Sequence, residues 1–429
     1  MILMEQYWLT GSVVFNDDIV LLHIYTLSWA SECKWRYLQL NVKSRCSKSW
    51  LNNQKRFTLA HCFFNFVNLV GLLMIGERLQ RARKGAGLAL RAVAEQADLS
   101  HTTVSKFEKE QQKPSSAQLI KLAKILGVRT EYFFRPQTLK IEGIEYRKKS
   151  TLPQKSLDKI QADIFDQAER WHELLSLYPQ PPIQPFTLPD SLPEHISDAE
   201  QIEALAEAVR ADWNLGLNCI PDMVDTLESQ GIMVISSTVG SDNKFDGLAG
   251  TINAMPLIVV GANWTGDRQR FTLAHELGHL LLKGRLDQSL LDDEEKLCNR
   301  FAGAFLLPES TLIEHLGKNR HRLENEELYL LKHEFGLSMQ GVLFRALQAE
   351  IITHATFQSI YKLFSIKGWR TREPKEQYPS EQTILFKQLV YRALAEEYFT
   401  ESKAAELLGL PVVRFHQQRT LESLEPVTH

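Results

Sequence analysis

The residues best suited to chemistry lie in the segment 270–280, which contains the pattern His-Glu-x-x-His. Positions i and i+4 share one face of a helix, so His275 and His279 can present ring nitrogens to one metal ion. Glu276 follows the first histidine and can reach a water molecule as a general base. This spacing predicts a zinc site that hydrolyses peptide bonds.

A third ligand is expected, because catalytic zinc is usually held by three protein side chains. Glu295 is the main candidate, since the apolar residues that follow it recur with helical spacing and place it at the start of the next helix. Glu294 is an alternative ligand. The acidic run 292–295 also suits the positive end of a helix, and that role would require no metal.

A second group of residues has the spacing of a DNA-binding motif. Residues 90–97 and 101–108 have helical spacing, and Ser100 can cap the second helix. Two short helices joined by such a turn form a helix-turn-helix, whose second helix enters the major groove. The candidate base contacts are His101, Thr102, Thr103, Ser105 and Lys106.

The charge distribution supports binding to a polyanion. Residues 74–136 contain twelve Lys/Arg and six Asp/Glu, a net charge of +6, whereas the whole chain carries −3. An alternative is a basic helical bundle that binds proteins. The side chains expected to contact phosphates, which position the protein without specifying sequence, are Arg78, Arg81, Arg83, Lys84 and Lys113.

These segments carry a family resemblance. Residues 271–279 read Phe-Thr-Leu-Ala-His-Glu-Leu-Gly-His, and residues 295–308 combine Glu295 with Asn299 and end in Leu-Leu-Pro. The chain resembles the ImmA/IrrE family of zinc metallopeptidases joined to an Xre-type helix-turn-helix domain, over roughly residues 75–375. The resemblance implies a metal site formed by His275, His279 and Glu295, with Glu276 as the catalytic carboxylate.

Three positions depart from the family patterns. Leu90 stands where a phosphate-contacting glutamine is usual, and Glu110 stands where a glycine usually follows the recognition helix. Both changes are expected to weaken DNA affinity. Cys298 stands where alanine is usual. A thiolate could compete for metal, but we expect Cys298 to pack as a small buried residue.

The expected fold class is α+β: an all-α helix-turn-helix domain, then a mainly helical, zincin-like metallopeptidase domain with a small β-sheet. Strands are expected at 232–236 and 256–261, and the second could pair with an extended substrate. The expected parts are an N-terminal extension (1–73), the helix-turn-helix domain (74–136), a connecting helix and Pro-rich linker (137–197), the metallopeptidase domain (198–375) and a C-terminal helical segment (376–429).

Residues 1–73 show little periodicity, although they hold three of the five cysteines and four of the eight tryptophans. We expect a natural start near Met74, so that the preceding segment is dispensable and makes few buried contacts with the two domains. Three polar residues interrupt the apolar run Phe57–Leu73, so no membrane span is expected. The odd, scattered cysteines indicate a reducing compartment, which favours the cytoplasm.

The primary interpretation is a cytoplasmic transcriptional regulator coupled to a zinc endopeptidase, with Zn²⁺ as cofactor. Its expected partners are double-stranded DNA, bound by a homodimer on an inverted repeat, and a protein substrate such as a repressor, toxin or antitoxin. The alternative is a repressor or antitoxin whose zinc fold serves only as a sensor or interaction platform. The presence of each expected catalytic residue favours the enzyme.

Overall fold

The structure is a computed structural model. It describes residues 6–15, 18–27, 38–41, 75–135, 139, 141–142, 153–238, 245–253 and 255–421. The chain divides into two compact units, residues 1–70 and 71–429. Within the described part of the chain, each helix is too short or too polar to span a bilayer.

The first unit contains an antiparallel sheet that the sequence analysis missed. Its strands are β1 (Gln6–Phe15), β2 (Asp18–Leu27) and β3 (Leu38–Asn41), paired in that order. β1 and β2 are rich in β-branched and aromatic residues, which favour strands, but lack a regular alternation of polar and apolar positions. The run Phe57–Leu73 lies outside the described residues, so the expectation for it stays a prediction.

The second unit begins with a helical domain that has its own core. Helices α3 and α4 have the predicted bounds, and Ser100 caps α4 by accepting from the Thr103 N–H at 3.0 Å. Buried Leu79, Val93 and Phe107 belong to one apolar cluster. The elements are α2 (Ile75–Gly85), α3 (Leu90–Ala97), α4 (His101–Glu108), α5 (Ser116–Leu126) and a 3-10 turn η1 (Thr130–Phe134).

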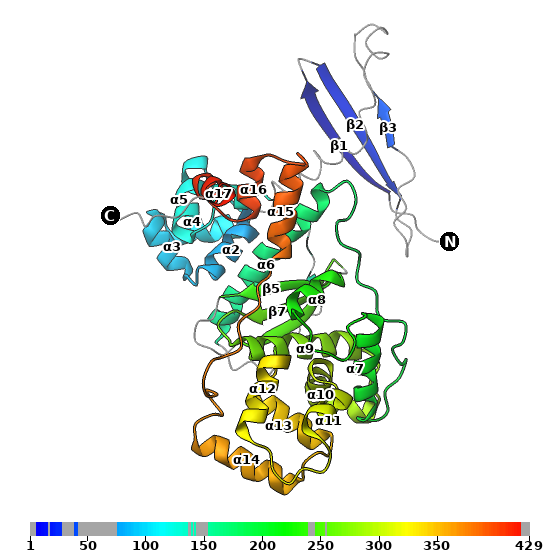
Figure 1. The fold of residues 1–429 in the computed structure, drawn as a ribbon. Helices are drawn as coiled ribbons and strands as arrows, with labels where there is room; N and C mark the ends of the chain where they lie inside the picture. The colour runs from blue at the N-terminus through cyan, green and yellow to red at the C-terminus, as the bar shows by residue number, and fades with distance from the viewer. Residues whose placement is uncertain are drawn as a thin grey trace. The chain divides into compact units, whose positions relative to one another are not determined.

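The rest of the unit is mainly helical around a small sheet, which confirms the α+β class (Figure 1). The strands are β4 (Ile141–Glu142), β5 (Met233–Ser237), β6 (Gly247–Ile252) and β7 (Met255–Gly261). The helices are α6 (Gln154–Leu177), α7 (Gln201–Asp212), α8 (Met223–Ser229), α9 (Gly266–Leu282), η2 (Gln288–Asp293), α10 (Glu294–Leu306), α11 (Glu309–Leu316), α12 (Asn325–Phe335), α13 (Met339–Gln348), α14 (His354–Ile366), α15 (Leu385–Ala395), α16 (Glu401–Leu407) and α17 (Val412–Arg419).

The strand order β4-β6-β7-β5 corrects one expectation. β7 is bonded to β6 on one side and to β5 on the other, so the prediction that it pairs with an extended substrate is wrong. β6, which the sequence analysis missed, is the outer strand along most of its length. Among the described residues, β4 pairs with it only at Thr251 and Ile252. Within this part of the chain, the outer edge from Gly247 to Gly250 has no paired strand, so it can accept another strand, as can the outer edge of β5.

Helix α6 connects the parts of the second unit. Its apolar stripe, with Ile160, Ile164 and Leu174 fully buried, shares a core cluster with the sheet and with helices α15 to α17. The hydroxyl of Tyr178, just after α6, donates to the Leu389 carbonyl of α15 at 2.7 Å. The C-terminal helices thus pack on α6.

Candidate functional site

Helix α9 places two histidines at its surface. Leu273, Leu277 and Leu281 anchor the helix in the main core. His275 and His279 lie one turn apart, with ring centroids at 4.7 Å and ring planes at 84°. Their Nε2 atoms are 3.0 Å apart, so both rings direct the same nitrogen toward one point.

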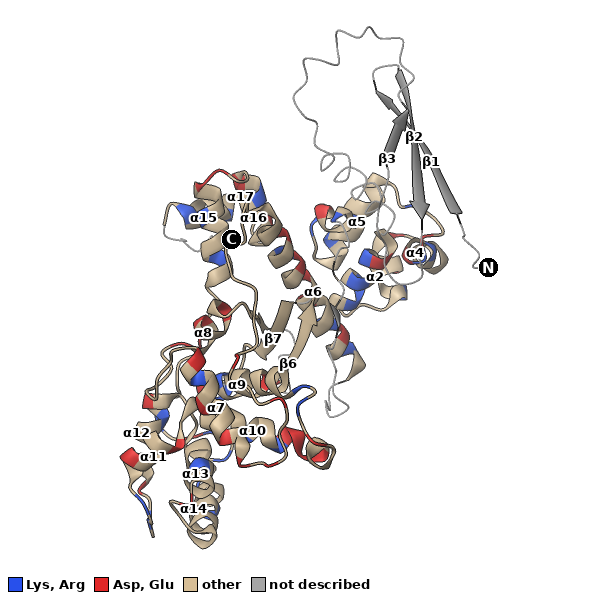
Figure 2. Cartoon of the chain, turned by 90° about the vertical axis from the view of Figure 1, so that its right-hand side faces the viewer, with Lys and Arg blue, Asp and Glu red and all other residues tan. Residues whose placement is uncertain are grey.

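Glu295 completes this arrangement from the first turn of α10. Its Oε2 lies 3.5 Å from His275 Nε2, and its Oε1 lies 3.6 Å from His279 Nε2. Neighbouring ligands of a tetrahedral zinc ion with bonds of about 2.0–2.1 Å are roughly 3.3–3.4 Å apart. The three side chains predicted as metal ligands therefore come together at separations that fit zinc. Figure 2 shows α10 next to α9, with acidic residues in red.

The approach of α10 to α9 depends on Gly278. A Cβ atom at this position would lie 3.2 Å from Phe301 Cδ1 and 3.4 Å from Cys298 Cα of α10, which is tighter than usual packing. Phe301 and Phe305 stack with centroids at 5.4 Å in the core beneath. The small residue in the His-Glu-x-x-His pattern thus lets the helix that carries Glu295 reach the histidines.

The other ring nitrogen of each histidine has its own polar partner. His275 Nδ1 lies 3.0 Å from Asn299 Oδ1, and His279 Nδ1 lies 2.9 Å from Glu294 Oε1. Oxygen acceptors at these positions fix a proton on Nδ1 and leave the Nε2 lone pairs for a metal. The sequence analysis assigned no role to Asn299. Its position four residues after Glu295, on the same face of α10, is the signal that could have found it.

A second set of possible ligands uses the opposite side of His279. His279, Glu294 and Cys298 form a group, with Cys298 Sγ 2.9 Å from His279 Nδ1. Cys298 is fully buried within the main core cluster, as expected for a small packed residue. A catalytic metal needs an open coordination position. The set with His275 and Glu295, both partly exposed, is the better suited to catalysis.

The side chain of Glu276, which belongs to α9, lies next to strand β6. It is half-buried, and a Cβ atom built on Gly247 would be 3.5 Å from its Cγ. The same Cβ would clash with Thr272 Cγ2 at 2.5 Å, so Gly247 allows the strand to run close along the helix. The candidate general base is therefore next to the open edge of the sheet.

The residues of the recognition helix α4 that were predicted to contact bases differ in their exposure to solvent. His101, Thr102 and Lys106 are exposed, whereas Thr103 and Ser105 are half-buried. The Ser100 hydroxyl is 2.7 Å from the Thr102 hydroxyl and 2.8 Å from that of Thr103, so all three oxygens gather at the start of α4. Val104 and Phe107 of the same helix are buried in the core of the domain.

The arginines of α2 differ most from expectation. Arg78 is 1% exposed and lies against Glu169 of α6, so the prediction that it contacts phosphate is wrong. Arg81 binds the same carboxylate at 2.8 Å. The Arg83 guanidinium holds Glu108 at 2.6 and 3.0 Å and the Leu88 carbonyl at 3.1 Å, and the Glu108 hydrogen bond raises its pKa. A phosphate contact by Arg83 would compete with these bonds.

The two departures in the helix-turn-helix region have structural roles. Glu110 adopts a φ of +57°, the left-handed conformation that usually favours glycine. Its carboxylate accepts a hydrogen bond from the Gly76 N–H and so caps the first turn of α2. Leu90 is partly buried against the core of this domain. Both residues therefore contribute to packing of the domain.

Comparisons with known proteins agree with this geometry. Residues 227–347 match the family model of the IrrE N-terminal-like domain, and residues 79–133 match that of a helix-turn-helix. The chain is 40% identical over 73 residues to the radiation response metalloprotease IrrE of Deinococcus radiodurans, which covers 14% of this chain and 22% of that protein. The chain thus matches about a fifth of the length of this relative.

The apo form of the competence regulator ComR from Streptococcus vestibularis matches 83% of this chain and 95% of that one, at 12% identity. Its TM-score of 0.14 does not establish a shared fold. The two family matches cover the recognition helix α4 and the residues His275, His279 and Glu295. The chain therefore contains an Xre-type helix-turn-helix domain followed by an IrrE-like metallopeptidase domain.

Proposed function

We propose that this chain is a DNA-binding transcriptional regulator coupled to a zinc-dependent endopeptidase that cleaves a protein. The observation that carries the proposal is the convergence of His275 Nε2, His279 Nε2 and the Glu295 carboxylate within 3.6 Å of one another. The Nδ1 partners of both histidines support it, because outer hydrogen bonds orient metal-ligating imidazoles. A repressor, toxin or antitoxin is the proposed class of substrate.

His275, His279 and Glu295 would hold the metal and leave a coordination position open. Zinc in such a site supplies Lewis acidity to a peptide carbonyl and to water. Glu276 takes the proton of the attacking water and hands it to the leaving amine. Asn299 and Glu294 keep the imidazoles oriented. The outer edge of β6 holds an extended peptide through main-chain hydrogen bonds, beside Glu276.

Helix α4 supplies the DNA contact. His101, Thr102 and Lys106 are exposed in or near its first turns, which enter the major groove in this type of domain. Thr103 and Ser105 lie beside them on α4 and are half-buried, so they would contact bases where the helix comes closest to the groove floor. Lys84 and Lys113, both predicted from the sequence to contact phosphates, are exposed and would do so. The expected arrangement is a dimer on an inverted repeat.

Metal analysis of purified variants tests the site. The wild type should contain about one zinc per chain, and His279→Ala should lose it. Glu276→Gln should keep zinc and abolish cleavage, measured by intact-mass proteomics of candidate partners, because it removes the base and leaves each ligand. Zinc retained in full by His279→Ala would refute the assignment.

Two further variants decide which set of ligands holds the metal. Glu295→Gln should release zinc, whereas Cys298→Ala should keep it. The reverse result would place the metal on His279, Glu294 and Cys298. If zinc is bound but Glu276→Gln leaves each partner unchanged, while zinc removal alters DNA affinity, the chain is a sensor or interaction platform.

The DNA contact is tested by binding to a selected operator and to unrelated duplexes. Lys106→Ala or Thr103→Ala should reduce the ratio of the two affinities, because these residues face base edges. Lys113→Ala should weaken both affinities alike. It should also reduce the slope of log affinity against log salt by about 0.9, the value for one phosphate contact. Absence of salt-sensitive binding would make this domain a protein-interaction module.

A further inference from the structure

A basic surface lies on helix α14 and the turn that follows it, within an otherwise acidic region. Residues 198–350 contain twenty-four Asp/Glu and thirteen Lys/Arg, a net charge of −11. Residues 351–372 contain four Lys/Arg and no Asp/Glu. We call these four the α14 patch: Lys362, Lys367, Arg370 and Arg372. All four side chains are exposed.

The α14 patch differs from those exposed cations of the same region that pair with carboxylates. Lys296 pairs with Asp293 at 2.6 Å, Arg322 with Glu324 at 2.9 Å, and Lys375 with Glu326 at 2.9 Å. Within the described ranges, the structure has no ion pair for any member of the α14 patch. Its positive field is therefore available to an external anion.

Aromatic rings hold two of these cations in place. The Arg370 guanidinium carbon lies 4.6 Å from the centre of the Tyr361 ring, and Lys367 Nζ lies 4.3 Å from that of Trp369. Tyr361 stacks on buried Phe357 with centroids at 5.4 Å. A cation–π contact restrains a charge without cancelling it. These side chains are thus partly ordered before an anion arrives.

The solvent face of α14 offers further hydrogen-bond donors. Gln358, Ser359 and Lys362 are exposed and lie on the side of the helix opposite buried Phe364. Lysine, arginine, serine and glutamine are the side chains that usually contact DNA phosphates. This face has no carboxylate that would repel a phosphate. Its composition fits a phosphodiester backbone better than a base edge.

We infer that the α14 patch binds the phosphate backbone of duplex DNA without reading its sequence. The occupant is DNA because the patch combines unpaired cations with neutral donors, and because α4 brings duplex DNA to the same chain. A second contact on one chain raises affinity through effective concentration. This gain in affinity rests on the proposed DNA contact of α4, whereas the binding by the patch itself does not.

The test compares full-length variants that lose equal charge. The patch variant carries Gln at all four positions of the α14 patch. The control variant carries Gln at Arg268, Lys296, Arg322 and Lys375, four exposed cations of the same region that pair with carboxylates. Affinity for a duplex without an operator is measured over a range of salt concentrations. The log–log slope should fall by up to about 3.6 in the patch variant, for four phosphates at about 0.9 each. The control should change far less.

Two outcomes would overturn the inference. Equal salt slopes for the patch and control variants would show that the α14 patch does not touch DNA. Loss of polyglutamate binding, with DNA binding intact, would assign the patch to an acidic protein partner. Thermal melting and zinc content are recorded for each variant. If the fourfold change impairs folding, Lys362→Glu replaces it, because this residue lies on the exposed helix face.

A variant of α4 separates this inference from the proposed function. Lys106→Ala should lower operator selectivity and retain the salt slope contributed by the α14 patch. If Lys106→Ala and Thr103→Ala leave selectivity unchanged, the proposal for α4 fails and the patch result stands. If the α4 variants lose operator selectivity but the patch variant keeps the wild-type salt slope, the proposal for α4 stands and the inference about the α14 patch fails.

Discussion

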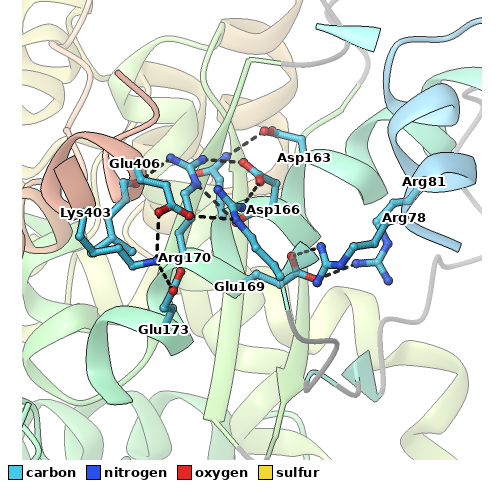
Figure 3. Close-up of polar contacts among 12 residues, drawn as sticks. Arg78, Arg81, Asp163, Asp166, Glu169, Arg170, Glu173, Lys403 and Glu406 are labelled. Carbon is cyan, nitrogen blue, oxygen red and sulfur yellow. Dashed lines mark hydrogen bonds and ion pairs between the residues drawn. The ribbon is translucent and has the colours of Figure 1, made fainter. Parts of the chain in front are cut away.

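The ion pairs between α2 and α6 give a quantitative prediction (Figure 3). Arg78 Nη1 lies 2.9 Å from Glu169 Oε2, and its Nη2 lies 3.2 Å from Oε1, a bidentate contact. Arg81 Nη1 lies 2.8 Å from the same Oε1. The exposed fractions of these side chains are 1% for Arg78, 7% for Glu169 and 12% for Arg81. One carboxylate therefore serves two largely dehydrated guanidinium groups.

The expected magnitude follows from this burial. Glu169→Gln removes the negative charge and leaves both arginines in place. Breaking a buried pair in this way costs about 3–5 kcal/mol, because both guanidinium groups lose the carboxylate that they share. Arg81 retains a contact of 3.4 Å with Glu77. An exposed pair such as Arg392–Glu396 contributes far less, because water screens the two charges.

Urea denaturation and amide hydrogen exchange in α2 to α5 measure the effect. Glu169→Gln should lower the stability of this domain by about 3–5 kcal/mol, whereas Glu396→Gln, at an exposed pair after α15, should lower protein stability far less. A double-mutant cycle with Arg78→Met and Glu169→Met should show the double variant to be more stable than either single variant, since apolar residues can replace a buried pair. A Glu169→Gln cost no greater than that of Glu396→Gln would refute the reasoning.

Other expectations test separate features. Gly247→Ala should leave zinc content unchanged and reduce peptide cleavage, since its Cβ would meet Thr272 at 2.5 Å and shift β6 from α9. Burial raises the pKa of Glu228 to about 8 from an ordinary 4.5, so the folded state holds a proton that the unfolded chain releases. The resulting stability is full below pH 4.5 and is lost as the pH rises toward about 8, by about 1.4 kcal/mol per unit. Urea midpoints at pH 5 and 8 should show that Glu228→Gln removes this loss. Ser100→Ala should lower the thermal stability of the helix-turn-helix domain by about 1 kcal/mol through loss of its cap. A chain that starts at Met74 should keep its zinc content and DNA affinity, measured by metal analysis and titration.

The approach of the candidate metal ligands to one another could be predicted because their geometry is mostly local. His275 and His279 share a helix, and the i, i+4 spacing fixes their relation wherever that helix lies. Glu295 followed from its place at the start of the next helix. The partners of the two Nδ1 atoms depend in addition on how two helices pack against each other. Asn299 and Glu294 reach them only because α10 packs against α9 at Gly278, which is a property of tertiary packing.

The order of the strands in the sheet could not be predicted from the sequence, for a related physical reason. The strand at 256–261 was expected, and its apolar run identified it as β7. Which strands flank it depends on contacts between separate segments. β6 has glycines at Gly247 and Gly250, which lower its strand propensity and hid it from the sequence analysis. The open edge therefore lies one strand further out than expected.

Helix α6 shows why charge counting misassigned Arg78. An amphipathic period predicts that the polar face of a helix is solvated. Glu169 is 91 residues from Arg78 in the chain, and no local pattern connects them. Further along the same helix, Arg170 donates to the Leu407 carbonyl of α16 at 3.1 Å, and Glu173 binds Lys403 (Figure 3). The polar side of α6 is therefore divided between α2 and α16, while its apolar side covers the sheet. The helix acts as a connector with three interfaces, and its charged residues specify which elements it joins.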